Sequence, residues 1–231
     1  MKRTTISILG MLVTWVIASM SAASAASPHA AQTSAPTETA DAKIYGCIRG
    51  LEQILPGDYY ACRALYHFQR KHYGQAVEML EEAAHWANKD AQYALGLIYF
   101  HGDVPGFPAN RPLSIAWLAL SAERKDPTYV QTYSLVSVES SPAEIQAANQ
   151  LWLKMGPEYG DKVAGLRALR RFNHEIAPIE QAADYGGSFY IRDYSPFPEN
   201  ALSIVRDLHA RADRDFDGLV GTVTVGALQE R

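Results

Sequence analysis

The sequence lacks the short motifs that mark many common enzyme classes. It contains no S-x-x-K, G-x-S-x-G or H-E-x-x-H pattern and no glycine-rich phosphate loop before a helix. Positive charge is also in deficit, with 21 Lys and Arg against 25 Asp and Glu and a net charge of -4. A surface of this sign has no general attraction for nucleic acid. These absences favour a protein that is not an enzyme and has no nucleic-acid partner.

Long apolar runs are scarce too. The run near the start, about residues 6–20, follows a basic pair and is shorter than the roughly 20 residues of a membrane span. Ala23 and Ala25 then provide the small-x-small spacing of a cleavage site. This pattern predicts a cleaved secretory signal, residues 1–25, with an uncleaved membrane anchor as the alternative. We therefore expect export to the periplasm or beyond, with no membrane span in the mature chain.

A segment of low complexity follows the signal. Residues 26–42 are mostly Ala, Ser, Thr, Pro and Gln. Such a composition buries too little apolar surface to offset the entropy of ordering, so we expect a flexible linker. The remainder of the chain is long enough for one hydrophobic core or a short array of repeats.

Cysteine is limited to two residues, Cys47 and Cys62, on either side of the turn signal Pro56-Gly57-Asp58. An even cysteine count in an exported protein suggests a disulfide, which here would close a loop of about 15 residues. Two buried thiols are the alternative. A metal pair is disfavoured because the spacing is not C-x-x-C and no histidine cluster accompanies it.

Most of the chain shows apolar residues at helical spacing, and we expect pairs of antiparallel helices. Residues 59–87 predict the first hairpin, with Gly74 ending its first helix. Asp90 is predicted to cap the next helix and Gly102 to close it. The predicted caps and ends of the later helices are Asn110, Asp126, Ser141 with Glu144 as a capping box, and Gly156 followed by Pro157.

The paired helices repeat loosely along the chain. Asp90 and Asp126 precede equivalent helices 36 residues apart. A period of this size, built from paired helices, is typical of an α-solenoid. The fold class predicted is therefore mostly α: a short α-solenoid over residues 43–156, followed by a small C-terminal α/β cap over residues 157–231.

The stretch from Ala91 to Lys125 resembles the Sel-one-like repeat, a relative of the tetratricopeptide repeat. The matching residues are Ala91, Leu95, Gly96, Tyr99, Gly102, Gly106, Ala116, Trp117 and Ala122. The resemblance is weaker in the neighbouring repeats and absent from the last 70 residues or so, and Pro112 and Ser121 depart from the family pattern. It implies a protein-interaction scaffold, often found in bacterial envelopes.

Inner helices of such stacks line a concave face, so their exposed positions are candidates for partner binding. The candidate binding residues are Tyr66, Gln69, Tyr73, Gln92 and Tyr99. The expected partner is an envelope protein or peptide.

The last part of the chain changes character. Residues 161–177 predict a helix with Val163, Leu166 and Phe172 inward, and Arg167, Arg170 and Arg171 on one basic face. That face suits either an anionic ligand or a solvated surface paired with nearby acids. A strand within residues 186–194, a helix over 198–216 and a second strand over 221–228 would form a small β-α-β cap.

An Asp-rich turn lies between the last helix and the last predicted strand. Asp213, Asp215, Asp217 and Gly218 copy positions one, three, five and six of a calcium loop, but position twelve is Thr224 rather than Glu. A weak calcium site and a soluble helix end are both compatible with this pattern, and no other cofactor is expected.

Two functions remain at this level. The favoured one is a non-catalytic exported scaffold that binds a protein or peptide through its repeats. The alternative is an envelope hydrolase or ligand-binding enzyme with its site in the C-terminal cap.

Overall fold

The computed structural model describes residues 47–219, and this part of the chain is mostly helical. The predicted class, a short helical solenoid with a small C-terminal α/β cap, is confirmed. The elements are α2 (Leu51–Ile54), α3 (Pro56–Gln69), α4 (Tyr73–His85), α5 (Lys89–His101), α6 (Arg111–Ser121), η1 (Ala122–Arg124), α7 (Pro127–Val138), α8 (Pro142–Tyr159), η2 (Asp161–Gly165), α9 (Leu166–Asp184), β1 (Ser188–Phe189), β2 (Glu199–Asn200) and α10 (Ala201–Asp215). The predicted signal, the predicted linker and the strand predicted at 221–228 lie outside the described residues.

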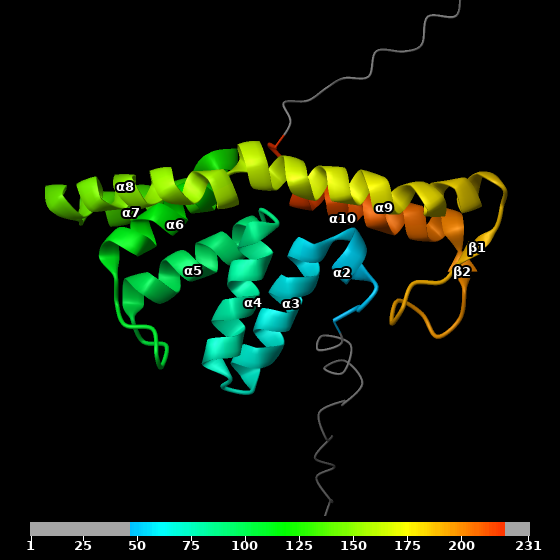
Figure 1. Ribbon diagram of the computed structural model, residues 1–231, viewed down its shortest axis with the longest axis horizontal. Coiled ribbons are helices and arrows are strands. Elements are labelled where there is room, and N and C mark those ends of the chain that lie inside the picture. Colours follow the sequence, from blue (N-terminus) through cyan, green and yellow to red (C-terminus); the bar gives the residue numbers. More distant parts are fainter. Residues whose placement is uncertain (1–46, 220–231) are drawn as a thin grey trace, which may run out of the picture. The chain divides into compact units, whose positions relative to one another are not determined.

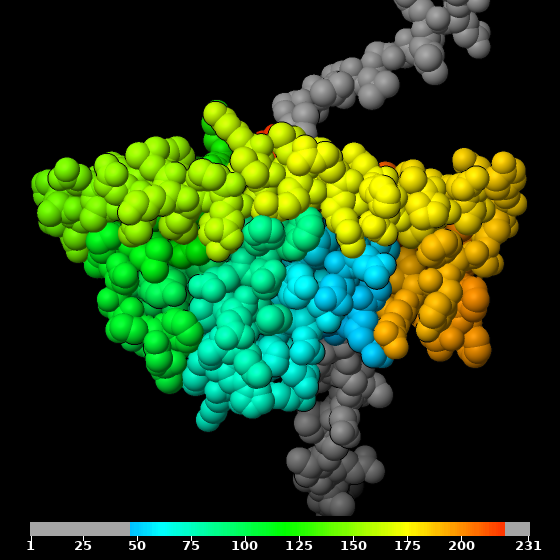
Figure 2. Space-filling view, in the orientation of Figure 1, coloured from blue at the N-terminus to red at the C-terminus, as the bar shows by residue number. Residues whose placement is uncertain are grey.

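Helices that follow one another in the chain pack as pairs. α3 packs on α4 and α5 on α6, while α6 also contacts both α7 and α8 (Figure 1). α8, η2 and α9 follow one another in a row, and α10 lies against α9. α4 packs on α8 and α2 packs on α9, so helices from the start of the described chain lie against this row (Figure 2).

Side-chain caps define most helix starts where the sequence predicted them. Asn110, Asp126 and Ser141 each accept a hydrogen bond from the first turn of their helix, and Glu144 completes the capping box. The predicted cap at Asp90 is wrong, because Asn88 accepts the bond from the Ala91 amide at 2.9 Å.

Removing the capping box should weaken the last repeat. We expect Ser141→Ala to lower the free energy of unfolding by about 1 kcal/mol, since it leaves the Glu144 amide without its acceptor. The exposed Ser203, in the first turn of α10, caps no helix, so Ser203→Ala is the matched control. Urea unfolding of both variants measures the difference, and equal losses would contradict the assignment.

Two helix ends lie elsewhere than the sequence predicted. α3 ends at Gln69 and Lys71 takes the left-handed conformation (φ 59°), so Gly74 falls within the first turn of α4. α8 continues through Gly156 and Pro157 to Tyr159. A proline ring removes one amide donor, but the neighbouring turns of α8 still hold the helix together at this point.

The disulfide prediction is confirmed, with the sulfurs of Cys47 and Cys62 2.10 Å apart. It ties the start of the described chain to α3. Beyond it, the Gly50 amide donates to the Arg192 carbonyl at 3.0 Å. The beginning of the described chain is therefore joined to the segment between β1 and β2.

Three apolar cores hold the helices together. One is shared by α3, α4, α5 and α6, and a smaller one lies among α6, α7 and α8. The third unites α2 with α9 and α10, and its buried members include Leu51, Phe172, Ile176, Ile204 and Leu208. Helices from the two ends of the described chain thus share one core.

The C-terminal part follows its predicted pattern incompletely. Val163 and Leu166 are 40% and 41% exposed rather than inward. Residues 161–165 form a π-helix, whose wider turn shifts the phase of the apolar stripe. β1 pairs with β2 in an antiparallel hairpin before α10, a pairing that the sequence did not predict.

Candidate functional site

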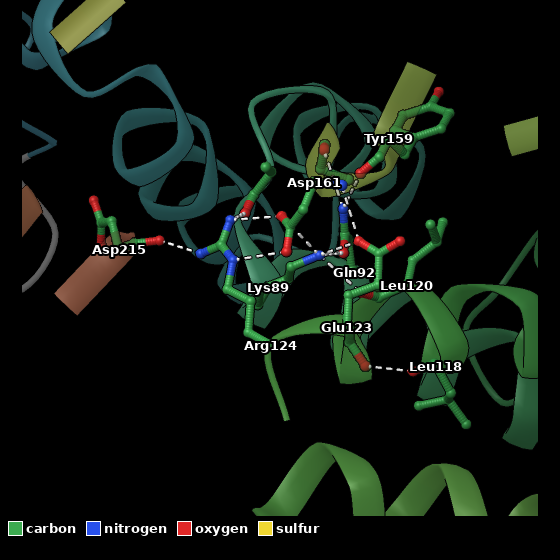
Figure 3. Close-up of polar contacts among 12 residues, drawn as sticks. Lys89, Gln92, Leu118, Leu120, Glu123, Arg124, Tyr159, Asp161 and Asp215 are labelled. Atoms are coloured by element: carbon green, nitrogen blue, oxygen red, sulfur yellow. Dashed lines mark hydrogen bonds and ion pairs between the residues drawn. The ribbon is translucent and has the colours of Figure 1, made fainter. Parts of the chain in front are cut away.

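Charged side chains are buried where α5, η1 and η2 meet (Figure 3). The Lys89 side chain is 7% exposed, and its Nζ lies 3.0 Å from Glu123 Oε2 and 3.1 Å from Asp161 Oδ1. The same ammonium donates to the Leu120 carbonyl at 2.7 Å and to Gln92 Oε1 at 3.0 Å. We call Lys89, Gln92, Glu123, Arg124 and Asp161 the buried ion cluster.

Arg124 connects this cluster to three other segments. Its guanidinium donates two hydrogen bonds to the Asp161 carboxylate, at 3.0 and 2.8 Å. It also donates to the Ala87 carbonyl at 3.1 Å and to the backbone carbonyl of Asp215 at the end of α10. One side chain therefore joins the repeats to both η2 and α10.

The backbone around the cluster is shaped to bring these groups together. Gly160 is buried, and a Cβ there would lie 2.7 Å from the Gly156 carbonyl oxygen, so only glycine permits this approach. The next residue, Asp161, donates its amide to Glu123 Oε2 at 2.9 Å. The turn from α8 into η2 thus delivers a carboxylate to Lys89 and Arg124.

The cluster is balanced in charge, with two cations facing two carboxylates. Burial lowers the pKa of Lys89, and this effect outweighs the attraction of Asp161 and Glu123. Charges that are buried, paired and hydrogen-bonded on several sides have little left to offer a ligand. We therefore assign the buried ion cluster a structural role and not a ligand-binding role.

A cavity of about 490 Å³ lies beside the cluster, bounded by the starts of α3, α5 and α7 and the end of α10. Its size falls in the range of small-molecule sites. Polar and charged groups dominate its walls: Asp58, Asn88, Lys89, Asp90, Arg124, Lys125, Asp126, Pro127, Tyr129, Arg214, Asp215 and Asp217.

Two carboxyl groups in this wall form a pair. Asp58 lies in the first turn of α3 and Asp215 is the last residue of α10, and both line this wall. Burial, followed by the charge of Asp58, raises the pKa of Asp215 to about 8, and burial also raises the pKa of Asp58. Both carboxyl groups therefore hold a proton more readily than an exposed aspartate does.

Exposed apolar side chains are found on the last two repeat helices. Leu135 and Val138 of α7 are 58% and 87% exposed, and Leu153 of α8 is 60% exposed. Val130 and Trp152 are exposed to a lesser degree. We call these five residues the α7–α8 apolar surface. α7 contains no charged residue from Pro127 to Val138, although the charged Asp126 and Glu139 flank it.

The five predicted binding residues do not form one surface. Tyr66, Gln69 and Tyr73 lie at one end of the α3–α4 hairpin, where the Arg70 guanidinium covers the Tyr66 ring at 3.7 Å. Tyr99 packs against Phe107. Gln92 is completely buried and donates to the Tyr159 carbonyl at 2.9 Å, so its side chain is not available to a partner.

The three residues predicted as calcium ligands are not brought together in the structure either. Asp213 and Asp215 are both within α10, where residues two apart point to different sides of the helix. Asp213 is exposed, whereas Asp215 pairs with Asp58 and Asp217 lies in the cavity wall. Within residues 47–219, no group of three or more His, Cys, Asp or Glu side chains is arranged to hold a metal ion. Thr224 lies outside the described residues.

The basic face predicted on α9 is largely used internally. Arg167 donates to the His85 carbonyl and, at 2.8 Å, to that of Glu158. Arg171 donates to the Gln53 carbonyl at 2.7 Å. Arg170 remains exposed. Two of the three arginines therefore join α9 to other helices rather than presenting a site for an anion.

Sequence reasoning missed both the cluster and the carboxyl pair. One signal was present, because a Lys-Asp pair recurs 36 residues apart at Lys89-Asp90 and Lys125-Asp126. Only the first lysine is buried, however, and the partners of Asp58 and Lys89 are distant in sequence. Nothing local marks those long-range pairings.

No helix in the described part of the chain is both long and apolar enough to cross a membrane. Comparison of the chain with protein-family models, curated proteins and solved structures gives no match.

Proposed function

We propose that the protein is a non-catalytic exported scaffold, which binds a protein or peptide partner of the cell envelope through its helical repeats. The observation that carries this proposal is the α7–α8 apolar surface. Two of its exposed members, Leu135 and Val138, lie on a helix without charge.

The position of this surface supports a binding role. A helical array needs polar outer faces on its end repeats to remain soluble. Here the last repeat instead exposes large apolar side chains on both of its helices. Exposed apolar side chains that gather on one side of an element mark contact sites more often than singly scattered ones do. On α7, residues 130, 135 and 138 fall within an arc of about 140°, so they face one direction.

The chemistry of the surface specifies the kind of partner. An uncharged apolar helix side fits the apolar side of an amphipathic helix or of another helical domain. The secretory signal pattern and the resemblance to the Sel-one-like repeat support an envelope location and an interaction role. Neither identifies the partner.

The test is to remove the apolar surface without disturbing the cores. We expect Leu135→Ser with Val138→Ser to reduce partner capture at least about tenfold, because each loses an apolar contact of roughly 1 kcal/mol or more. Leu202→Ser is the matched control, since Leu202 of α10 is 46% exposed and lies outside this surface. Crosslinking of the tagged protein in intact cells, followed by quantitative mass spectrometry, gives the captured amount.

Equal capture by the double variant and the control would contradict the proposal, as would the absence of any partner near the abundance of the tagged protein. A deletion after Gly156 is unsuitable, because it removes α9 and α10 and uncovers the core they share with α2. Thermal melting confirms that both point variants are folded.

A second candidate, an envelope hydrolase, is favoured by the carboxyl pair in the cavity wall. Two neighbouring carboxyl groups can act as general acid and general base. A panel of cell-wall, β-lactam and ester substrates tests this function, and Asp215→Asn should abolish any turnover found. No turnover by the wild-type protein would count against it.

A further inference from the structure

We propose that the turn between α3 and α4 is a binding site for phosphate groups, either free in solution or carried by the headgroups of an anionic membrane. The site consists of Arg63, His67, Arg70, Lys71 and His72, which we call the hairpin-tip basic patch. It lies on other helices than the α7–α8 apolar surface, so this inference goes beyond the scaffold proposal.

Positive charge is concentrated in this part of the chain. Residues 61–77 contain three Arg and Lys, two His and no Asp or Glu, although acids outnumber bases in the whole chain. Arg70, Lys71 and His72 are exposed and connect α3 to α4, at the edge of the molecule remote from α8 and α9 (Figure 1). The patch is therefore a positive island on a protein whose net charge is -4.

α3 brings two arginines of the patch to the same aromatic ring. Residues 63, 66, 67 and 70 fall within an arc of about 100° on a helix, so they share one face. The guanidinium carbons of Arg63 and Arg70 lie 4.9 and 3.7 Å from the centroid of the Tyr66 ring. A ring that holds a guanidinium by its face leaves the N–H donors at the rim for other acceptors. Tyr66 therefore positions two planar donor groups close together.

No carboxylate of the described residues forms an ion pair with the arginines or the lysine of the patch. Arg63, Arg70 and Lys71 take part in none of the salt bridges within residues 47–219. α4 begins at the same turn without an acidic residue in its first turn and without a side-chain cap, so it supplies no anionic group either. Like charges held close together repel each other, and a bound anion would remove this repulsion.

The two histidines of the patch belong to the same arrangement. The Arg63 guanidinium donates to His67 Nε2 at 3.3 Å, and the ring centroids of His67 and His72 are 6.0 Å apart. Since Nε2 accepts here, neutral His67 carries its proton on Nδ1, a buried atom that has no hydrogen-bond partner among the described residues. Burial, followed by the charges of Arg63, His72 and Arg70, lowers the pKa of His67, and Glu78 opposes them most weakly. The patch therefore has more donors than acceptors.

The chemistry of the patch favours a phosphate over a single carboxylate. Each guanidinium has a planar fork of donors that matches two phosphate oxygens, and a doubly charged phosphate balances more than one cation. Lys71 adds a third charge on a flexible stem beside Arg70. Access is open as well, because a Cβ at Gly74, in the first turn of α4, would meet no described atom within 4 Å.

Titration with inorganic phosphate tests the free form of the ligand. At constant pH and ionic strength, the ring-proton NMR signals of the two patch histidines should shift saturably in the full-length protein. Arg63→Gln with Arg70→Gln should weaken the apparent affinity at least about tenfold, because it removes both charge-assisted donors. Arg170→Gln with Arg206→Gln is the matched control, since it removes the same charge from exposed positions of α9 and α10 and should bind like the wild type.

Vesicles test the membrane-bound form of the ligand. Vesicles of equal parts phosphatidylglycerol and phosphatidylcholine should sediment with the wild-type and control proteins and release them as salt is added, because the patch is exposed. The Arg63→Gln, Arg70→Gln variant should stay in solution, as should every protein with phosphatidylcholine alone. Binding in either arm supports the proposal, and the arm that responds identifies the source of the phosphate.

Absence of binding in both arms would overturn the proposal, as would equal weakening in the double variant and the control. Binding of polyglutamate but of neither phosphate probe would also overturn it, in favour of an acidic protein partner. If Arg63→Gln with Arg70→Gln does not fold, Arg70→Gln with Lys71→Gln changes two exposed side chains and should give the same loss. Neither arm involves the α7–α8 apolar surface or partner capture, so this site and the scaffold proposal can fail separately.

Discussion

Replacing Lys89 by methionine should lower the free energy of unfolding by about 3–5 kcal/mol, because it leaves a carboxylate buried without its cation. Methionine fills the space of the lysine stem but offers nothing to Glu123 or Asp161. Asp161 keeps Arg124, so Glu123 bears most of the uncompensated charge. Urea unfolding at pH 7 measures the loss.

Two further variants make this expectation specific. Lys154→Met changes the same residue type at an exposed position of α8 and should alter stability by less than about 0.5 kcal/mol. Adding Glu123→Gln to Lys89→Met should recover part of the loss, because the amide oxygen still accepts from the Asp161 amide without carrying a charge. A loss below about 1 kcal/mol for Lys89→Met would show that water reaches the cluster and replaces the lysine.

Phe172→Ala should be similarly damaging, with an expected loss of about 3–5 kcal/mol. Phe172 is 3% exposed and lies edge-on to His209 and to Phe216, with ring centroids 5.4 and 6.1 Å away. Truncation leaves a cavity in the core that α9 and α10 share with α2. The same substitution at Phe197, which is 74% exposed, is the control and should cost little.

Thermal melting and urea unfolding both report this effect. The larger loss should appear as a lower midpoint with an unchanged denaturant slope, because the whole described unit unfolds together. Equal losses for the two phenylalanine variants would mean that the shared core contributes no more than the surface does.

The helical pairs could be predicted from the sequence because their signals are local. Asn110, Asp126 and Ser141 each precede an apolar stripe at helical spacing, and each caps a helix in the structure. Cys47 and Cys62 were also predictable, since they flank a short turn. Errors arose where two local signals competed: Asn88 and Asp90 are both suitable caps, and Lys71 adopts the left-handed conformation that glycine usually takes.

The candidate site could not be predicted because its pairings are distant in sequence. Lys89 meets Asp161 across 72 residues, and Asp58 meets Asp215 across 157. The phase of α9 was also misjudged, since residues 161–165 form a π-helix that no sequence pattern indicated. Hydrophobic spacing defines helices, but it does not say which of them meet.

The core shared by α2, α9 and α10 has a consequence for the order in which the chain acquires its structure. A linear array of repeats can fold from its first unit onward during synthesis. Here α2 gains its apolar cover only when residues more than a hundred positions further along the chain are in place. The Cys47–Cys62 bridge spans only 15 residues and can therefore form early. It would keep α2 beside α3 until α9 and α10 have folded against it.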